Sequence, residues 1–170
     1  MKGLDNYLDL YILSNAVALF MMFTAWKAPK VSRLMFFLLF AWAGYTNWTT
    51  AIHNPYSYLN NADLALLNVY KQFIFGWFSK HIIVMVGFIA TCQVLIAISM
   101  LLKGQIFKTG CIGAIVFLLA IAPLGVGAAF PCTVIMAAAL FMILKNSPAQ
   151  YLWIKAQKEK TPNNFNTKLQ

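Results

Sequence analysis

The sequence predicts an all-α integral membrane protein that crosses the bilayer five times. Its 170 residues are 61% hydrophobic and only 10% charged, a balance typical of membrane proteins rather than of water-soluble domains. No Asp, Glu, Lys or Arg occurs over the 36 residues from Thr109 to Leu144. A straight helix of this length would reach about 54 Å, whereas the hydrocarbon core of a bilayer is about 30 Å thick. We therefore expect this run to cross the membrane twice, turning between Pro123 and Pro131.

Three further apolar segments precede this pair. They lie at about Leu10–Trp26, about Leu34–Ile52 and Ile82–Leu102, and none contains a charged side chain. Each has the 17 to 21 residues that one crossing requires. The uncharged run adds spans near Phe107–Leu124 and Pro131–Leu144, which makes five. The last span is short, and the number falls to four if it only re-enters the membrane.

The net charge of +9 follows the membrane topology rather than indicating a nucleic-acid partner, and the expected partner is the lipid bilayer. One side of the membrane receives Lys27, Lys30, Arg33, Lys103, Lys108, Lys145, Lys155, Lys158, Lys160 and Lys168, whereas the other receives only Lys2, Lys71 and Lys80. The positive-inside bias then places the amino terminus outside and the carboxyl terminus in the cytoplasm. We divide the chain into a transmembrane helical domain over residues 1–154 and a polar, basic cytoplasmic tail over residues 155–170.

The longest outer connection, residues 53–80, predicts an amphipathic outer helix between the second and third spans. Its apolar residues recur at three- and four-residue spacing, which is typical of one helix face. They are Leu66, Leu67, Tyr70, Phe73, Ile74, Trp77 and Phe78. The helix is expected to begin after a cap at Asn60 or Asn61 and to bend at Gly76 or Ser79 before it continues into the third span. Two interpretations stay open: an aromatic belt that anchors the chain in the interface, or a lid over a cavity between the spans.

Polar side chains gather in the outer half of the second span, and one more lies in the middle of the third. Asn47, flanked by Tyr45 and Trp48, cannot stay unpaired in hydrocarbon and must face a neighbouring helix or a wet cavity. The simplest role of Gln93 is a hydrogen bond between helices, worth about 0.6–2 kcal/mol in a membrane.

His53 and His81 are the only histidines, and they lie at the outer ends of the second and third spans. If the two helices bring these imidazoles together, the pair has the chemistry to ligate haem or copper, or to hydrogen-bond the head group of a quinone. Because no second histidine pair or nearby cysteine ligand accompanies them, haem is disfavoured and no metal ligand is assigned. A plain interfacial role for both histidines is the alternative.

These residues form one candidate ligand-binding site for a quinone or another lipophilic molecule. It comprises Tyr45, Asn47, Trp48, His53, Trp77, His81 and Gln93. No catalytic residue is assigned, because Asp63 is the only acidic residue between Asp9 and Glu159. The absence of a C-x-x-C motif argues against a disulfide-forming or vitamin-K-reducing thiol oxidoreductase. Whether the protein is an enzyme stays open.

Several short motifs from Val31 to Lys145 resemble those of a known family. They are Ser32-Arg33 before an apolar helix that contains Gly44, the stretch from Gly87 to Gln93, Leu101-Leu102-Lys103-Gly104, and Lys108-Thr109-Gly110. In these motifs the chain resembles the DoxX-like small integral membrane proteins. The resemblance implies a four-helix bundle in a bacterial inner membrane, here with an extra amino-terminal transmembrane helix. It also implies association with quinone-linked respiratory or thiol-redox complexes.

The chain departs from the DoxX-like pattern inside its spans. Family members often carry a lysine shortly after the glycine of their first helix and an acidic residue in the next helix. This sequence has Thr49 or Thr50 and Gln93 at the corresponding places. The resemblance therefore does not extend to proton-coupled chemistry.

Three functions fit these features. The first, which we favour, is an accessory membrane subunit that binds a quinone or another lipophilic ligand and supports a membrane oxidoreductase complex. The second is a non-catalytic assembly or anchoring subunit that packs on other membrane subunits, or on itself, through faces of small residues. These faces surround Gly110, Gly113, Ala114 and Ala137–Ala139. The third is a small oligomeric transporter, although the lack of charge inside the spans disfavours ion coupling.

Overall fold

The computed structural model describes residues 8–146, and every regular element in this range is helical, so the all-helical fold class is confirmed. Five long helices account for most of it. They are α1 (Leu8–Lys27), α2 (Pro29–His53), α5 (Ile82–Leu101), α6 (Gly104–Ile121) and α7 (Cys132–Asn146). The predicted tail over residues 155–170 lies outside the described residues, and so does the predicted domain boundary at residue 154.

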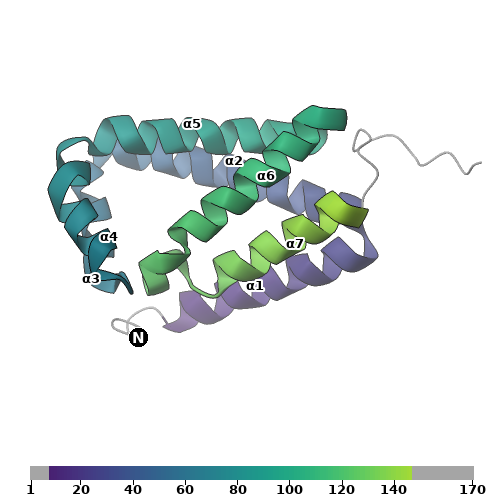
Figure 1. Cartoon of the computed structure of the whole chain (residues 1–170), viewed down its shortest axis with the longest axis horizontal. Helices are drawn as coiled ribbons and strands as arrows, with labels where there is room; N and C mark the ends of the chain where they lie inside the picture. Colours follow the sequence, from purple (N-terminus) through teal and green to yellow (C-terminus); the bar gives the residue numbers. More distant parts are fainter. Residues whose placement is uncertain (1–7, 147–170) are drawn as a thin grey trace, which may run out of the picture.

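The five long helices pack as a closed ring. In chain order each one packs against the next, and α7 returns to pack against α1. Figure 1 shows α2 and α5 side by side on one edge and α1 and α7 on the other, with α6 crossing from the α5 side to the α7 side. Because α1 packs against both α2 and α7, the ring is closed.

Three segments are long and apolar enough to cross a membrane. They are Leu8–Lys27, Ile82–Leu101 and Gly104–Ala128. α7 is apolar but shorter, with 15 residues. α2 has 25 residues but is less apolar, because it carries Lys30 and Arg33 near its start and several polar side chains near its end. Three of the five predicted spans are therefore long enough and apolar enough to cross a membrane.

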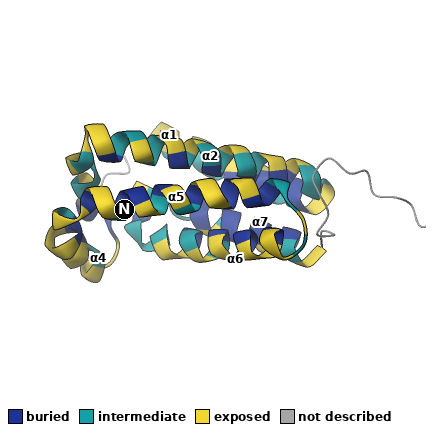
Figure 2. Cartoon of the chain, turned by 90° about the horizontal axis from the view of Figure 1, so that it is seen from above, coloured by how far each residue is buried: buried dark blue, intermediate teal, exposed yellow. Residues whose placement is uncertain are grey.

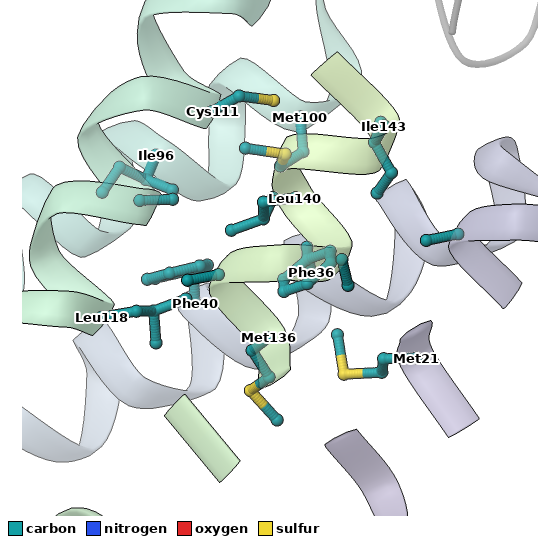
Figure 3. Close-up of a cluster of buried hydrophobic side chains, with 14 of the residues drawn as sticks. Met21, Phe36, Phe40, Ile96, Met100, Cys111, Leu118, Met136, Leu140 and Ile143 are labelled. Carbon is teal, nitrogen blue, oxygen red and sulfur yellow. The ribbon is translucent and has the colours of Figure 1, made fainter. Parts of the chain in front are cut away.

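The interior is apolar, and so is the outer surface. All five long helices contribute to one buried cluster, whose labelled members in Figure 3 are Met21, Phe36, Phe40, Ile96, Met100, Cys111, Leu118, Met136, Leu140 and Ile143. Figure 2 shows buried residues along the inward sides of the helices and exposed residues along their outward sides. Large apolar side chains are among the exposed ones, including Val84 at 75% and Phe88 at 70%. An apolar exterior of this extent is what a lipid environment favours.

The turns between the long helices follow local sequence signals. α1 and α2 are separated by Ala28 alone, and Pro29 starts α2, where its missing N–H costs no helical hydrogen bond. α6 gives way to η4, a 3-10 helix over Ala122–Ala128, before α7 begins. The predicted turn between Pro123 and Pro131 is therefore present. Gly125 lies in it at φ +64°, a left-handed conformation that glycine adopts without steric cost.

Four short helices cover one end of the bundle, and we call residues 55–78 the cap segment. It consists of η2 (Pro55–Asn60), α3 (Asn61–Leu64), α4 (Asn68–Phe73) and the π-helix η3 (Ile74–Phe78). One continuous amphipathic helix was expected here, and this expectation is wrong. The chain is extended at Ala65 and Leu67, which separates α3 from α4. The expected bend at Gly76 is present, with φ −87° and ψ −106° inside η3.

Hydrogen bonds to the α6–η4 region explain this interruption. The Leu66 N–H donates to the carbonyl of Pro123 at 2.9 Å, instead of continuing the helix. The Tyr70 hydroxyl donates to the carbonyl of Ala120 at 2.7 Å. These bonds tie the cap segment to the last turn of α6, which holds Ala120, and to the start of η4, which holds Pro123. Tertiary contacts therefore outweigh the helical periodicity of the cap segment.

The faces of small residues lie mostly inside the bundle. Gly110, Ala114, Ala137 and Ala139 are buried within the chain, whereas Gly113 and Ala138 are exposed. At Gly110, α6 approaches α5 so closely that an added Cβ would lie 2.5 Å from Ser99 Cβ.

We predict that Gly110→Ala lowers the melting temperature of the protein in detergent. The new methyl group must push α5 and α6 apart, and overpacking of this kind costs about 1–3 kcal/mol. Gly113→Ala on the same helix is the control, because its nearest neighbouring atom would lie 3.9 Å away. Equal melting temperatures for the two variants would contradict the close approach of the helices.

Candidate functional site

The antiparallel pair of α2 and α5 carries most of the predicted site. Its two glycines permit close contact: an added Cβ on Gly44 would lie 3.0 Å from the carbonyl oxygen of Ala90. Gly87 accommodates the indole of Trp48, whose Cη2 would lie 3.1 Å from an added Cβ. The helix axes therefore come near enough for short polar side chains to reach across the contact.

Three side chains form a hydrogen-bonded group at this contact, which we call the polar layer: Asn47, Tyr58 and Gln93. The Asn47 amide Nδ2 donates to Gln93 Oε1 at 2.8 Å. The Tyr58 hydroxyl donates to Asn47 Oδ1 at 2.9 Å. Gln93 is only 3% exposed. The predicted hydrogen bond between helices is therefore present, and Asn47 is its partner.

Tyr58 is the member of the polar layer that sequence reasoning missed. It lies in η2, which folds back over the end of α2. No periodic pattern marks a residue whose position depends on the path of a turn. Burial raises the pKa of the Tyr58 phenol, so its hydroxyl keeps its proton and remains a donor to Asn47.

The polar layer separates two apolar clusters. On one side is the main core, to which α2 contributes Phe40 and α5 contributes Ile96. On the other side is a smaller cluster under the cap segment, made of Ala51, Ala62, Ile74, Phe78, Ile82 and Val86. Because the amides bind each other, the polar layer is a structural element inside the bundle.

The second group of predicted residues lies outside, where the cap segment joins α5. The rings of Phe73 and Trp77 stack with centroids 6.1 Å apart, and those of Trp77 and His81 with centroids 4.5 Å apart. We call these three side chains the aromatic ladder. All three are exposed, Trp77 at 56%. His81 Nδ1 lies 2.9 Å from the carbonyl oxygen of Trp77.

The remaining predicted residues are not joined to either group by a polar contact. Tyr45 and His53 are exposed on α2, and no hydrogen bond or ring contact connects them with the aromatic ladder in the described part of the chain. His53 and His81 do lie at the same end of the bundle, where α2 ends and α5 begins. The seven predicted residues thus fall into an inner group, an outer group and separate surface positions.

Arg33 is the most deeply buried charged residue in the described chain, and sequence reasoning had placed it in a connection. It lies in the second turn of α2 and is 1% exposed. Its Nη2 donates to the carbonyl oxygens of Met100 and Leu102, at 2.7 Å each, and its Nε donates to Met100 at 3.0 Å. The guanidinium carbon also lies 3.9 Å from the centroid of the Phe107 ring.

These contacts give Arg33 a structural role. The last carbonyls of a helix have no partners within the helix, and the planar guanidinium binds two of them where α5 ends. It also stacks on α6, so one side chain joins three helices. In the sequence, the only indication of this structural role is the pair Ser32-Arg33 at the start of an apolar run. The charge pattern instead assigned Arg33 to a connection on the positively charged side of the membrane.

No cluster of three or more His, Cys, Asp or Glu side chains that would hold a metal occurs among residues 8–146. The three cysteines are unpaired, and Cys111 and Cys132 are buried. The binding chemistry that these residues offer is therefore aromatic stacking and hydrogen bonding.

The chain matches no protein-family model, no curated protein and no solved structure. These comparisons neither support nor contradict the DoxX-like resemblance, which stays a prediction.

We predict that Asn47→Leu and Gln93→Leu each lower the stability of the bundle. Gln93→Leu leaves the half-buried Asn47 amide without this partner, whereas Asn47→Leu does so for the buried Gln93 amide and for the Tyr58 hydroxyl; each lost hydrogen bond costs about 0.6–2 kcal/mol in a membrane protein. The double variant should lose less than the sum of the two, since it removes both amides. Thermal unfolding of all four proteins in detergent measures this coupling. Thr46→Val is the control, because the Thr46 hydroxyl bonds only within its own helix. If the stability lost by the double variant equals the sum of the two single losses, the hydrogen bond between Asn47 and Gln93 is contradicted.

We also predict that Arg33→Lys lowers the melting temperature although it preserves the charge. An ammonium group lacks the planar fork that reaches both carbonyls and stacks on Phe107, and each hydrogen bond to a charged group is worth about 1.5–3 kcal/mol. Lys108→Arg, at an exposed position of α6, should change stability by less than about 0.5 kcal/mol. A wild-type melting temperature in the Arg33 variant would show that charge alone suffices.

Proposed function

We propose that this protein is an accessory integral membrane subunit that holds a quinone or another lipophilic ring at the aromatic ladder and supports a membrane oxidoreductase complex. The observation that carries the proposal is the exposed stack of Phe73, Trp77 and His81. Exposed aromatic faces attract flat rings, and the imidazole adds a polar anchor. The link to an oxidoreductase comes from the DoxX-like resemblance.

The proposal places the protein in a bacterial inner membrane with five spans, the amino terminus outside and the carboxyl terminus in the cytoplasm. The order of the helices supports this, since α1 begins at the capped end and α7 ends at the opposite one. The exposed lysines 27, 103, 108 and 145 lie at that opposite end. The positive-inside bias assigns this end to the cytoplasm.

In this orientation the aromatic ladder lies near the outer membrane interface. Trp is enriched at that depth, where its ring contacts lipid and its N–H contacts water. A lipophilic ring that diffuses in the bilayer reaches the ladder from the side. The polar layer lies deeper, and its amides already bind each other, so we assign it no contact with the ligand.

The test is to purify the full chain gently in nanodiscs and analyse it by mass spectrometry and visible absorption. We expect a lipophilic ring compound in stoichiometric amount in the wild type, and its loss from Trp77→Ala. Trp26→Ala is the control, because Trp26 is similarly exposed, at 63%, near the opposite end of the bundle. A stable protein partner with no bound ring compound would refute ligand binding and favour the assembly subunit.

A further inference from the structure

We infer that the ligand of the aromatic ladder carries a ring hydroxyl group, as a lipophilic phenol or a hydroquinone does, and donates a hydrogen bond to Nε2 of His81. The inference rests on the proposed function and specifies the ligand class. Within the proposed function, it favours the reduced hydroquinone form of a quinone, or a phenol, over the oxidised quinone, which offers only carbonyl and ether oxygens.

The hydrogen bond to Trp77 determines which nitrogen of His81 carries the proton. A carbonyl oxygen accepts hydrogen bonds and cannot donate them, so Nδ1, at 2.9 Å from the Trp77 carbonyl oxygen, must be the donor. In a neutral imidazole only one nitrogen is protonated. Nε2 therefore presents a lone pair and acts as an acceptor.

His81 is held in this orientation by its surroundings. Its ring stacks on Trp77 at an interplanar angle of 20°. Its backbone N–H donates to the carbonyl of Phe78 at 2.9 Å, and its carbonyl accepts from the N–H of Met85 at 2.9 Å. The Ser79 hydroxyl bonds the carbonyls of Phe75 and Gly76, which stabilises the turn between the two rings. The acceptor is therefore preorganised rather than free to rotate.

Nε2 of His81 is left for a ligand. The side chain is exposed, and no hydrogen bond to Nε2 occurs in the described part of the chain. A ring that lies beside the aromatic ladder, edge to edge with the imidazole and near its plane, can donate its hydroxyl hydrogen to the Nε2 lone pair. A ring with only carbonyl oxygens would place two acceptors against each other, which gives no hydrogen bond. We propose recognition only, without proton or electron transfer.

The experiment compares a 4-alkylphenol with its methyl ether, which has the same ring and chain but no donor. Binding to the full chain in nanodiscs is measured by tryptophan fluorescence in mildly alkaline buffer, with empty nanodiscs as the reference for partitioning into lipid. One neutral hydrogen bond is worth about 1 kcal/mol, so the phenol should bind about fivefold tighter. His81→Phe keeps an aromatic ring but removes the acceptor, and the ratio should fall to about one.

Tyr56→Phe is the matched control, because it removes a polar group from another exposed aromatic side chain of the cap segment, and it should leave the ratio unchanged. Equal affinities of phenol and ether for the wild type would overturn the inference while leaving ring binding at the aromatic ladder intact. A preference for the phenol that persists in His81→Phe would overturn the assignment to His81. Failure of both compounds to bind the wild type would refute the proposed function itself. The comparison of ligands on the wild type decides the inference even if a variant does not fold.

Discussion

The close pairing of α2 with α5 is the constraint on which the rest of the bundle depends. Gly44 and Gly87 permit it, the amides of Asn47 and Gln93 fix its register, and Arg33 holds the carboxyl-terminal end of α5. Each interaction depends on the close approach that the others maintain. In a lipid environment this matters more than in water, because apolar side chains gain little by leaving lipid for another helix.

The two ends of this pair serve different purposes. At the end where α5 meets α6, a buried guanidinium satisfies helix carbonyls and joins three helices. At the other end the cap segment covers a small apolar cluster, and its aromatic ladder faces outward. The polar layer lies between these two ends. It separates the tightly packed main core from the end of the bundle whose exposed surface we assign to a ligand. The proposed binding surface is thus held by a rigid pair of helices, as binding sites require.

Hydropathy was sufficient to locate the long helices, because a charge-free run long enough to cross a bilayer is rarely anything other than a membrane-spanning helix. The hydrogen bond made by Gln93 was also predictable, since a buried amide must find a partner. Tyr58 was not, because its place depends on how residues 55–60 turn back. The cap segment was predicted as one helix because periodicity does not reveal the competing bond from Leu66 to Pro123. Arg33 was misplaced because counting charges does not distinguish a topological lysine from a buried arginine.

The closure of the helix ring has a consequence for biogenesis. The first helix completes its packing only against the last one, and the cap segment binds carbonyls of Ala120 and Pro123, which are synthesised later. A chain that leaves the ribosome from its amino terminus can pair α2 with α5 early, but α1 must wait in the bilayer for α7. Truncation after α6 would therefore leave α1 without its principal partner and expose the nascent protein to membrane quality control.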